Sequence, residues 1–198
     1  IPHSWSGPPR APIQNGPKAW QTLFGERRVL NMGFGWDRTQ NVLWRLDHGE
    51  FDGLHPRWVV VNIGTNNFST TAHAQANTPA QVAAGIRAIC LRIRAKSPES
   101  RIIVMGVLPR GAQADDSYRV RIAELNQLLP ELGQVPGITF LDIRIGNEPG
   151  GKPTIELGGC AAVRAEALGV RRVHVSVSHG REQAVAFVVL EGGPAGAV

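Results

Sequence analysis

Four short apolar runs alternate with longer segments in which apolar residues recur every three or four positions. The runs at 58–63 and 101–108 are nearly continuous in Val and Ile, a composition typical of strands buried on both faces of a sheet. The other two predicted strands cover residues 28–32 and 138–143. This alternation predicts a parallel sheet covered by helices, in a three-layer α/β domain over residues 17–143.

The segments between the runs carry helix signals. Thr78 followed by Pro79 is a typical N-cap with a proline in the first turn, and apolar residues then recur at helical spacing up to Lys96. A shorter helix is expected over 37–46. A further helix begins at Asp115, Asp116 or Ser117 and places Ile122, Leu125, Leu129 and Leu132 on one face.

The composition changes after residue 157. Among the 41 residues of 158–198, 28 are Ala, Val, Gly or Arg, and none is Asp, Asn, Trp, Tyr, Lys or Thr. We therefore divide the chain into a partial domain over 1–157 and a tail of atypical composition over 158–198. Because a frame shift in GC-rich DNA yields such residues, we interpret the tail as frameshifted, which the encoding nucleotides would decide. The tail is compatible with a helix over 161–168 and strands over 173–177 and 184–190.

Composition and charge narrow the function classes. With 42% hydrophobic and 19% charged residues, the chain falls among ordinary globular proteins. Its net charge of +5 comes from scattered cations, the longest runs being Arg27-Arg28 and Arg171-Arg172, so nucleic-acid binding is not expected. No stretch approaches the ~20 apolar residues that span a bilayer. Cys90 and Cys160 show no paired spacing, so we expect neither a disulfide framework nor a structural zinc site, and the sequence shows no other metal-ligand spacing.

The residues that follow the predicted strands carry the candidate chemistry, because ligands of open parallel sheets bind beyond the carboxyl ends of the strands. Gly33-Phe34-Gly35-Trp36 follows the first run, Gly64-Thr65-Asn66-Asn67 the second, and Pro109-Arg110-Gly111 the third. Glycines expose backbone N–H groups, and Asn side chains donate hydrogen bonds without charge, as an oxyanion hole requires. Each segment taken singly is also ordinary turn chemistry.

Taken together, these segments resemble the SGNH hydrolases, also called GDSL esterases, and within them the branch similar to platelet-activating-factor acetylhydrolase. The resemblance runs over 31–39, 41–50, 59–67 and 102–111, in the order and spacing of the family, and fades near Asp142. It implies a flavodoxin-like parallel sheet with helices on both faces. It also implies ester hydrolysis by a Ser nucleophile with a His base oriented by an Asp, without a cofactor.

The resemblance assigns three donors to the oxyanion: the Ser N–H, a backbone N–H of the second block and an Asn side chain of the third. Asn66 matches that Asn, and the backbone donor falls on Trp36, where the family usually has Gly. Trp tolerates positive φ poorly, so this position departs from the family pattern. Gly35, beside Trp36, and Arg110, at the expected pocket rim, are expected to bind the substrate.

The family's nucleophile block is not found. The chain opens with Ile1-Pro2-His3-Ser4-Trp5, which is similar to the residues just after the family's Gly-Asp-Ser. We therefore expect the first strand and the nucleophile to precede these residues. Ser4 and Ser6 are the nearby hydroxyls, but no strand precedes them to form the sharp turn that exposes a nucleophile.

The final Asp-x-x-His-Pro block is also missing from its place. No Asp follows Asp142, so His174 and His179 are expected to be surface or packing residues. A literal match at 52–56 precedes the strand that Asn66 follows. A strand of about six residues rising ~3.3 Å each separates His55 from Asn66 by roughly 20 Å. His55 is therefore excluded as the base, which must contact the nucleophile.

The charged residues of the helix expected over 37–46 have a simpler interpretation. Arg38 and Arg45 stand close in sequence to Asp37 and Asp47. We expect them to be solvated or paired surface charges, because such pairs are common on exposed helices.

The favoured interpretation is a carboxylic ester hydrolase for acetyl or short-chain acyl esters of lipids or sugars, with the 198 residues as written incomplete and inactive. One alternative is a non-catalytic binding or assembly module on the same fold. Another is a flavodoxin-like nucleotide-binding domain with Gly33-Phe34-Gly35-Trp36 as its phosphate loop, although the third glycine is missing. The resemblance also implies a homodimer as one assembly state. The particular ester and the compartment stay open.

Overall fold

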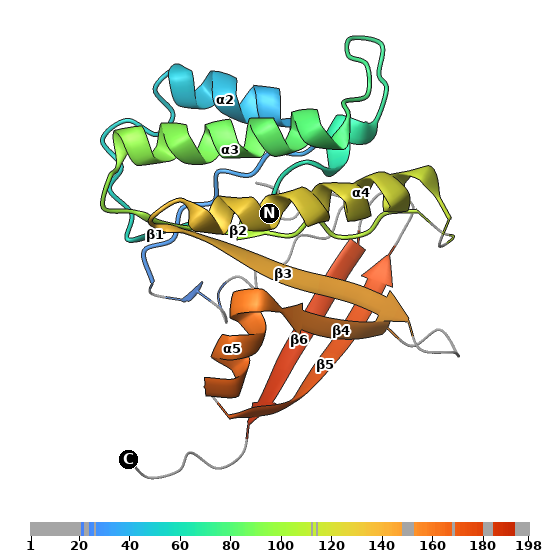
Figure 1. Cartoon of the computed structure of the whole chain (residues 1–198). Coiled ribbons are helices and arrows are strands. Elements are labelled where there is room, and N and C mark those ends of the chain that lie inside the picture. The colour runs from blue at the N-terminus through green and yellow to red at the C-terminus, as the bar shows by residue number, and fades with distance from the viewer. Residues whose placement is uncertain are drawn as a thin grey trace.

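The computed structural model describes residues 21, 24, 25, 27–111, 113, 115–147, 153–167, 169–179 and 184–192. Four strands form one sheet in the order β1-β2-β3-β4 (Figure 1). β1 (Trp58–Val61), β2 (Arg101–Met105) and β3 (Ile138–Asn147) are parallel, and β4 (Pro153–Gly158) is antiparallel to β3. A separate antiparallel pair joins β5 (Val170–His179) to β6 (Ala184–Gly192).

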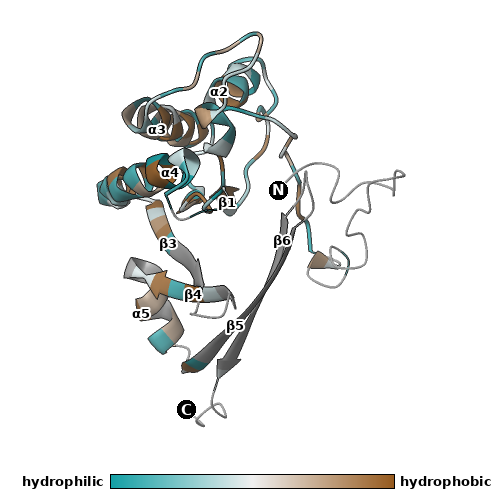
Figure 2. Cartoon of the chain, turned by 90° about the vertical axis from the view of Figure 1, so that its right-hand side faces the viewer, coloured by the Kyte–Doolittle hydropathy of each residue, from teal (hydrophilic) through white to brown (hydrophobic). Residues whose placement is uncertain are grey.

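Helices lie on both sides of the sheet. On one side, α2 (Thr39–Asp47), α3 (Pro79–Lys96) and α4 (Ser117–Leu128) pack as a layer. On the other, α5 (Gly159–Ala167) packs against β3 and β4, at the end of the molecule away from α3 (Figures 1 and 2). The predicted α/β class, a parallel sheet with helices on both faces, is confirmed.

The two long helices begin where the sequence places their caps. The Thr78 hydroxyl accepts a hydrogen bond from the Gln81 N–H (3.3 Å), and the Gln81 side chain accepts one from the Thr78 N–H (2.9 Å). The Asp116 carboxylate accepts one from the Tyr118 N–H (2.8 Å) and so caps α4. The apolar face predicted after this cap is buried, and it continues onto the short 3-10 helix η3 (Leu129–Gln134).

The hydrophobic core lies between the sheet and the α2–α4 layer. Ile102 and Val104 of β2 are fully buried on this face. On β1, by contrast, Trp58 and Val60 are 47% and 59% exposed. The prediction that the run at 58–63 is buried on both faces is therefore wrong for the described residues, because helices cover only one face of β1 there.

The strand predicted at 28–32 is wrong as well. These residues belong to no helix or strand, and Val29 and Leu30 are 43% and 65% exposed. An apolar run becomes a strand only beside a neighbour that satisfies its backbone groups. Within the described part of the chain, β1 pairs with β2 alone, so no neighbour is placed beside residues 28–32.

The elements after residue 147 were predicted in part. The helix and both strands of the tail form, with somewhat different bounds from those expected. β4 was not predicted, although it pairs with β3 along six registered positions from Asp142–Gly158 to Asn147–Pro153. The domain boundary at residue 157 stays a prediction. Among the described residues, no helix has the length and apolarity to cross a membrane.

Candidate oxyanion site

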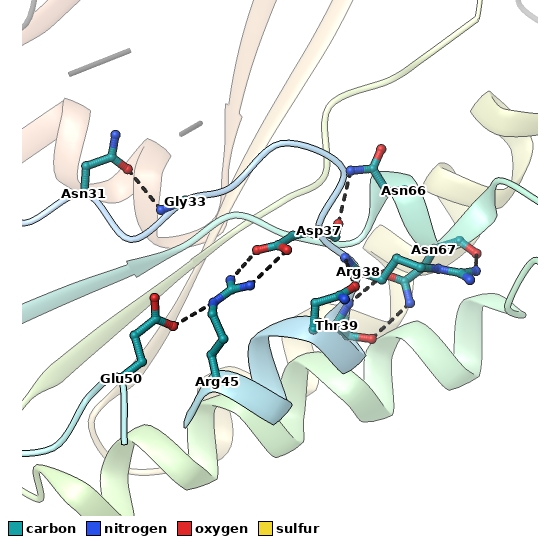
Figure 3. A network of polar contacts seen from close by, with 10 residues as sticks. Asn31, Gly33, Asp37, Arg38, Thr39, Arg45, Glu50, Asn66 and Asn67 are labelled. Carbon is teal, nitrogen blue, oxygen red and sulfur yellow. Dashed lines mark hydrogen bonds and ion pairs between the residues drawn. The ribbon is translucent and has the colours of Figure 1, made fainter. Parts of the chain in front are cut away.

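The turn that precedes α2 holds the first candidate donor. Trp36 has φ 65°, the left-handed conformation that glycine adopts most readily, and its side chain is 76% exposed. Upstream in the same segment, the Asn31 side chain accepts a hydrogen bond from the Gly33 N–H (3.1 Å; Figure 3). A tryptophan thus takes the backbone geometry expected of the family's glycine, despite the poor tolerance that its side chain predicts.

The second candidate donor lies on the 3-10 helix η2 (Thr65–Phe68), which follows β1. Gly64 enters it at φ 130°, and a Cβ there would lie 3.0 Å from a Val82 methyl group. The Asn66 side-chain nitrogen donates to the Asp37 carbonyl (3.1 Å), so it reaches the turn that contains Trp36 (Figure 3). A carboxamide nitrogen carries two hydrogens, and this bond uses one of them.

The neighbouring Asn67 has a different role. Its side chain is fully buried, its oxygen accepts from the Thr39 N–H (3.0 Å), and its nitrogen donates to the Thr39 hydroxyl (3.0 Å). The side-chain oxygens of Gln40 (3.0 Å) and Asn77 (2.9 Å) also lie within hydrogen-bond distance of this nitrogen, so its two hydrogens are shared among three acceptors. Because Thr39 is the first residue of α2, Asn67 fixes the start of that helix against the strand end that carries Asn66.

Arg38 contradicts the expectation of a solvated surface charge. It is buried, and its Nη2 donates to the carbonyls of Asn67 (2.8 Å) and Gln75 (2.6 Å) and to the Asn77 side chain (3.3 Å). Its Nε is buried without a hydrogen-bond partner. The extended start of α2 directs this side chain under the 67–77 segment, which supplies backbone carbonyls in place of water.

Arg45 is paired, as predicted, but it is largely buried. Its two terminal nitrogens bind the Asp37 carboxylate, and its Nε donates to Glu50 (2.7 Å). The guanidinium also lies 4.5 Å from the centroid of the Phe34 ring. The hydrogen bond with Asp37 is the main cause that raises the pKa of Arg45 above its ordinary value. Sequence spacing gave no signal for this cluster, since positions 37 and 45 lie beyond one helical turn of each other.

The two expected substrate contacts lie in different surroundings. Arg110 donates to the Ser69 hydroxyl (2.9 Å), and its guanidinium lies 4.0 Å from the Tyr118 ring centroid. Gly35 is exposed, and a Cβ added there would meet nothing within 4 Å. Contact of either residue with a substrate stays a prediction.

The remaining candidates lie away from Asn66 or outside the described residues. Asp52 and His55 precede β1, whereas Asn66 follows it, and Asp52 binds Lys96 at the end of α3. His174 and His179 lie on β5, outside the four-stranded sheet, and Ser4 and Ser6 are not among the described residues. No group of three or more His, Cys, Asp or Glu residues able to hold a metal occurs in the described ranges.

Comparison with known proteins decides the family. The sequence profile of the GDSL-like lipase/acylhydrolase family matches residues 5–173. The chain belongs to this family. It is 41% identical over 125 residues to the platelet-activating factor acetylhydrolase IB subunit alpha2 of Rattus norvegicus, a match that covers 63% of this chain and 51% of the relative. The human subunit is 40% identical over 124 residues, covering 62% and 51%. The chain thus spans about half the length of these GDSL relatives.

Solved structures of other hydrolases share the architecture. The acetylxylan esterase Axe2 of Geobacillus stearothermophilus superposes with a TM-score of 0.50 at 17% identity, over 64% of this chain and 59% of that one. LAE5, an alpha/beta hydrolase from the metagenome of Lake Arreo, gives a TM-score of 0.50 at 18% identity, over 64% and 60%. At such identities the likeness supports the fold alone.

Proposed function

We propose that this GDSL-family protein is a carboxylic ester hydrolase, and that the Asn66 side chain and the Trp36 backbone N–H stabilise the oxyanion of its reaction. The observation that supports this most is the 3.1 Å hydrogen bond from Asn66 to the carbonyl of Asp37, the residue next to Trp36. Two neutral donors, 30 positions apart in sequence, thereby come from adjoining segments. Neutral, preorganised donors are what a tetrahedral acyl-transfer intermediate requires.

The chemistry follows from the family resemblance. A Ser hydroxyl attacks the ester carbonyl carbon as its proton passes to a His, and the carbonyl oxygen becomes an anion. The Asn66 and Trp36 N–H groups donate to that oxygen. As the tetrahedral intermediate collapses, the protonated His returns the proton to the leaving alcohol, and water then hydrolyses the acyl enzyme. Asn66 and Trp36 contribute the part of this cycle that stabilises charge.

The 198 residues contain neither a Gly-Asp-Ser segment nor an Asp-x-x-His pair after the third strand. We therefore propose that the 198 residues by themselves do not turn over an ester. Acetyl and other short acyl esters are the proposed substrates, since the similar proteins include acetylhydrolases. Gly35 and Arg110 are the residues proposed to contact them, and a homodimer is the proposed assembly.

The test compares hydrolysis of p-nitrophenyl acetate by the 198-residue chain and by the complete product of its gene. We expect the 198-residue chain to give no turnover above buffer, and the complete gene product to hydrolyse the ester. In the complete product, Asn66→Ala should lower kcat on the order of a hundredfold. Absence of turnover from both proteins would contradict the hydrolase proposal. Turnover by the 198 residues that a Ser-directed phosphonate abolishes would instead assign the nucleophile to Ser4 or Ser6.

A further inference from the structure

We propose that Arg45 is a positioning residue, which holds the 34–37 turn so that the Trp36 N–H keeps its direction beside Asn66. The proposal rests on the oxyanion role proposed above for these two groups. Arg45, a side chain of α2, thus orients the Trp36 backbone N–H without contacting it.

Arg45 contacts the turn on both sides of Trp36. Its terminal nitrogens bind both oxygens of the Asp37 carboxylate, directly after Trp36, and its guanidinium lies 4.5 Å from the ring centroid of Phe34, two residues before it. Glu50 fixes the guanidinium from a third direction through Nε (2.7 Å). A planar fork that binds a carboxylate with two nitrogens restricts orientation as well as distance.

The contact continues to the second donor. Asp37 accepts the Asn66 hydrogen bond at its backbone carbonyl (3.1 Å), while its side chain is bound to Arg45. Arg45, Asp37 and Asn66 therefore form a continuous series, and Figure 3 shows Asp37 between the other two. A shift of Asp37 would move the backbone of Trp36, and with it the Gly35–Trp36 peptide that carries the Trp36 N–H, relative to Asn66.

The conformation of Trp36 explains why an anchor is needed. A residue with a Cβ at φ 65° is strained, and a side chain that is 76% exposed has little packing to offset the strain. The contacts of Phe34 and Asp37 with Arg45 stabilise the strained conformation of Trp36 through its neighbours. Without them, the turn is free to relax to negative φ, which would turn the Trp36 N–H away.

The test measures the backbone of Trp36 directly. A residue with positive φ has a short distance between its own amide and α hydrogens, which gives a strong intraresidue NOE. We expect this NOE in the 198-residue chain, its loss in Arg45→Met, and an intermediate value in Arg45→Lys, which keeps the charge but not the fork. Arg92→Met is the matched control, because Arg92 forms an exposed ion pair with Asp47, at the end of α2 away from Trp36. It should leave the NOE unchanged.

Activity of the complete gene product supplies the second readout. Arg45→Met should lower kcat by about tenfold or more with KM within threefold, because a displaced donor weakens transition-state binding. Adding Trp36→Gly should restore much of kcat, since glycine adopts positive φ without strain.

The outcomes separate the two proposals. An unchanged NOE in a folded Arg45→Met variant overturns the positioning role. If the Met variant does not fold, an unchanged NOE in Arg45→Lys overturns it instead. Failure of Trp36→Gly to restore activity also counts against it. If the complete wild-type protein hydrolyses no ester, the proposed function fails, while the NOE still decides whether Arg45 holds the turn.

Discussion

Two sets of polar contacts hold α2 in place, and they differ in burial. The inner set, formed by Asp37, Arg38, Arg45, Asn66 and Asn67, joins the start of α2 to the segment after β1. The outer set joins α3 to the last residue of α2 through the ion pair Arg92–Asp47, and to the turn after α2 through Lys96–Asp52. Arg45 and Asp37 side chains are 18% and 11% exposed, against 54% and 44% for Arg92 and Asp47. We therefore expect similar residue types to contribute differently to stability, because water competes less with the inner set than with the exposed Arg92–Asp47 pair.

The largest effect should follow from Asn67→Ala. The change leaves the Thr39 N–H and hydroxyl and the Gln40 and Asn77 oxygens without this partner inside the protein. Unsatisfied buried groups cost about 1–3 kcal/mol each before relaxation, so we expect a loss of about 3 kcal/mol in the free energy of unfolding. Urea titration followed by circular dichroism measures it.

Asn66→Ala is the matched control for that change. Asn66 is partly buried and gives one hydrogen bond to a backbone carbonyl, so its loss should cost about 1 kcal/mol or less. Equal losses for the two variants would mean that burial does not distinguish these neighbours. Together with the activity test, the pair separates a residue that builds the site from one that we propose acts in it.

A smaller effect should separate Arg45→Met from Arg92→Met. The first leaves the carboxylates of Asp37 and Glu50 facing each other without their cation, so we expect a loss of about 2 kcal/mol in unfolding free energy. The second removes one exposed pair and should change the urea midpoint very little. A similar shift of the midpoint in both variants would contradict the contrast between the inner and outer sets.

The sequence predicted the parts of the molecule that depend on local signals. The Thr78 cap, the buried face of α4 and the position of Asn66 after a strand follow from short patterns, and the structure agrees. Of the three starts left open for α4, the structure selects Asp116 as the cap. The run at 28–32 was predicted as a strand from its apolar residues, but pairing depends on a neighbour in space. Composition cannot report whether such a neighbour is present.

The burial of Arg38 escaped prediction for a related reason. Nothing near Arg38 in sequence indicates that carbonyls of the 67–77 segment will replace its water, because those partners lie some 30 positions away. Trp36 illustrates the converse case. Its side chain argues against positive φ, yet anchored neighbours on both sides impose that backbone, so contacts outweigh intrinsic preference.

The smallest predicted effect is the pH dependence of the outer set. The hydrogen bond with Arg92 is the main cause that lowers the pKa of Asp47 below its ordinary value of 3.8. A lowered carboxyl pKa stabilises the folded state at pH values above 3.8, and this contribution disappears as the pH falls through the folded-state value. The small difference in urea midpoint between wild type and Arg92→Met should therefore be present at pH 7 and vanish in strong acid. Because both side chains are exposed, about 0.5 M salt at pH 7 should also remove it by screening. A difference that survives salt would mean that the Arg92–Asp47 pair is shielded from water, and the outer set would then resemble the inner one.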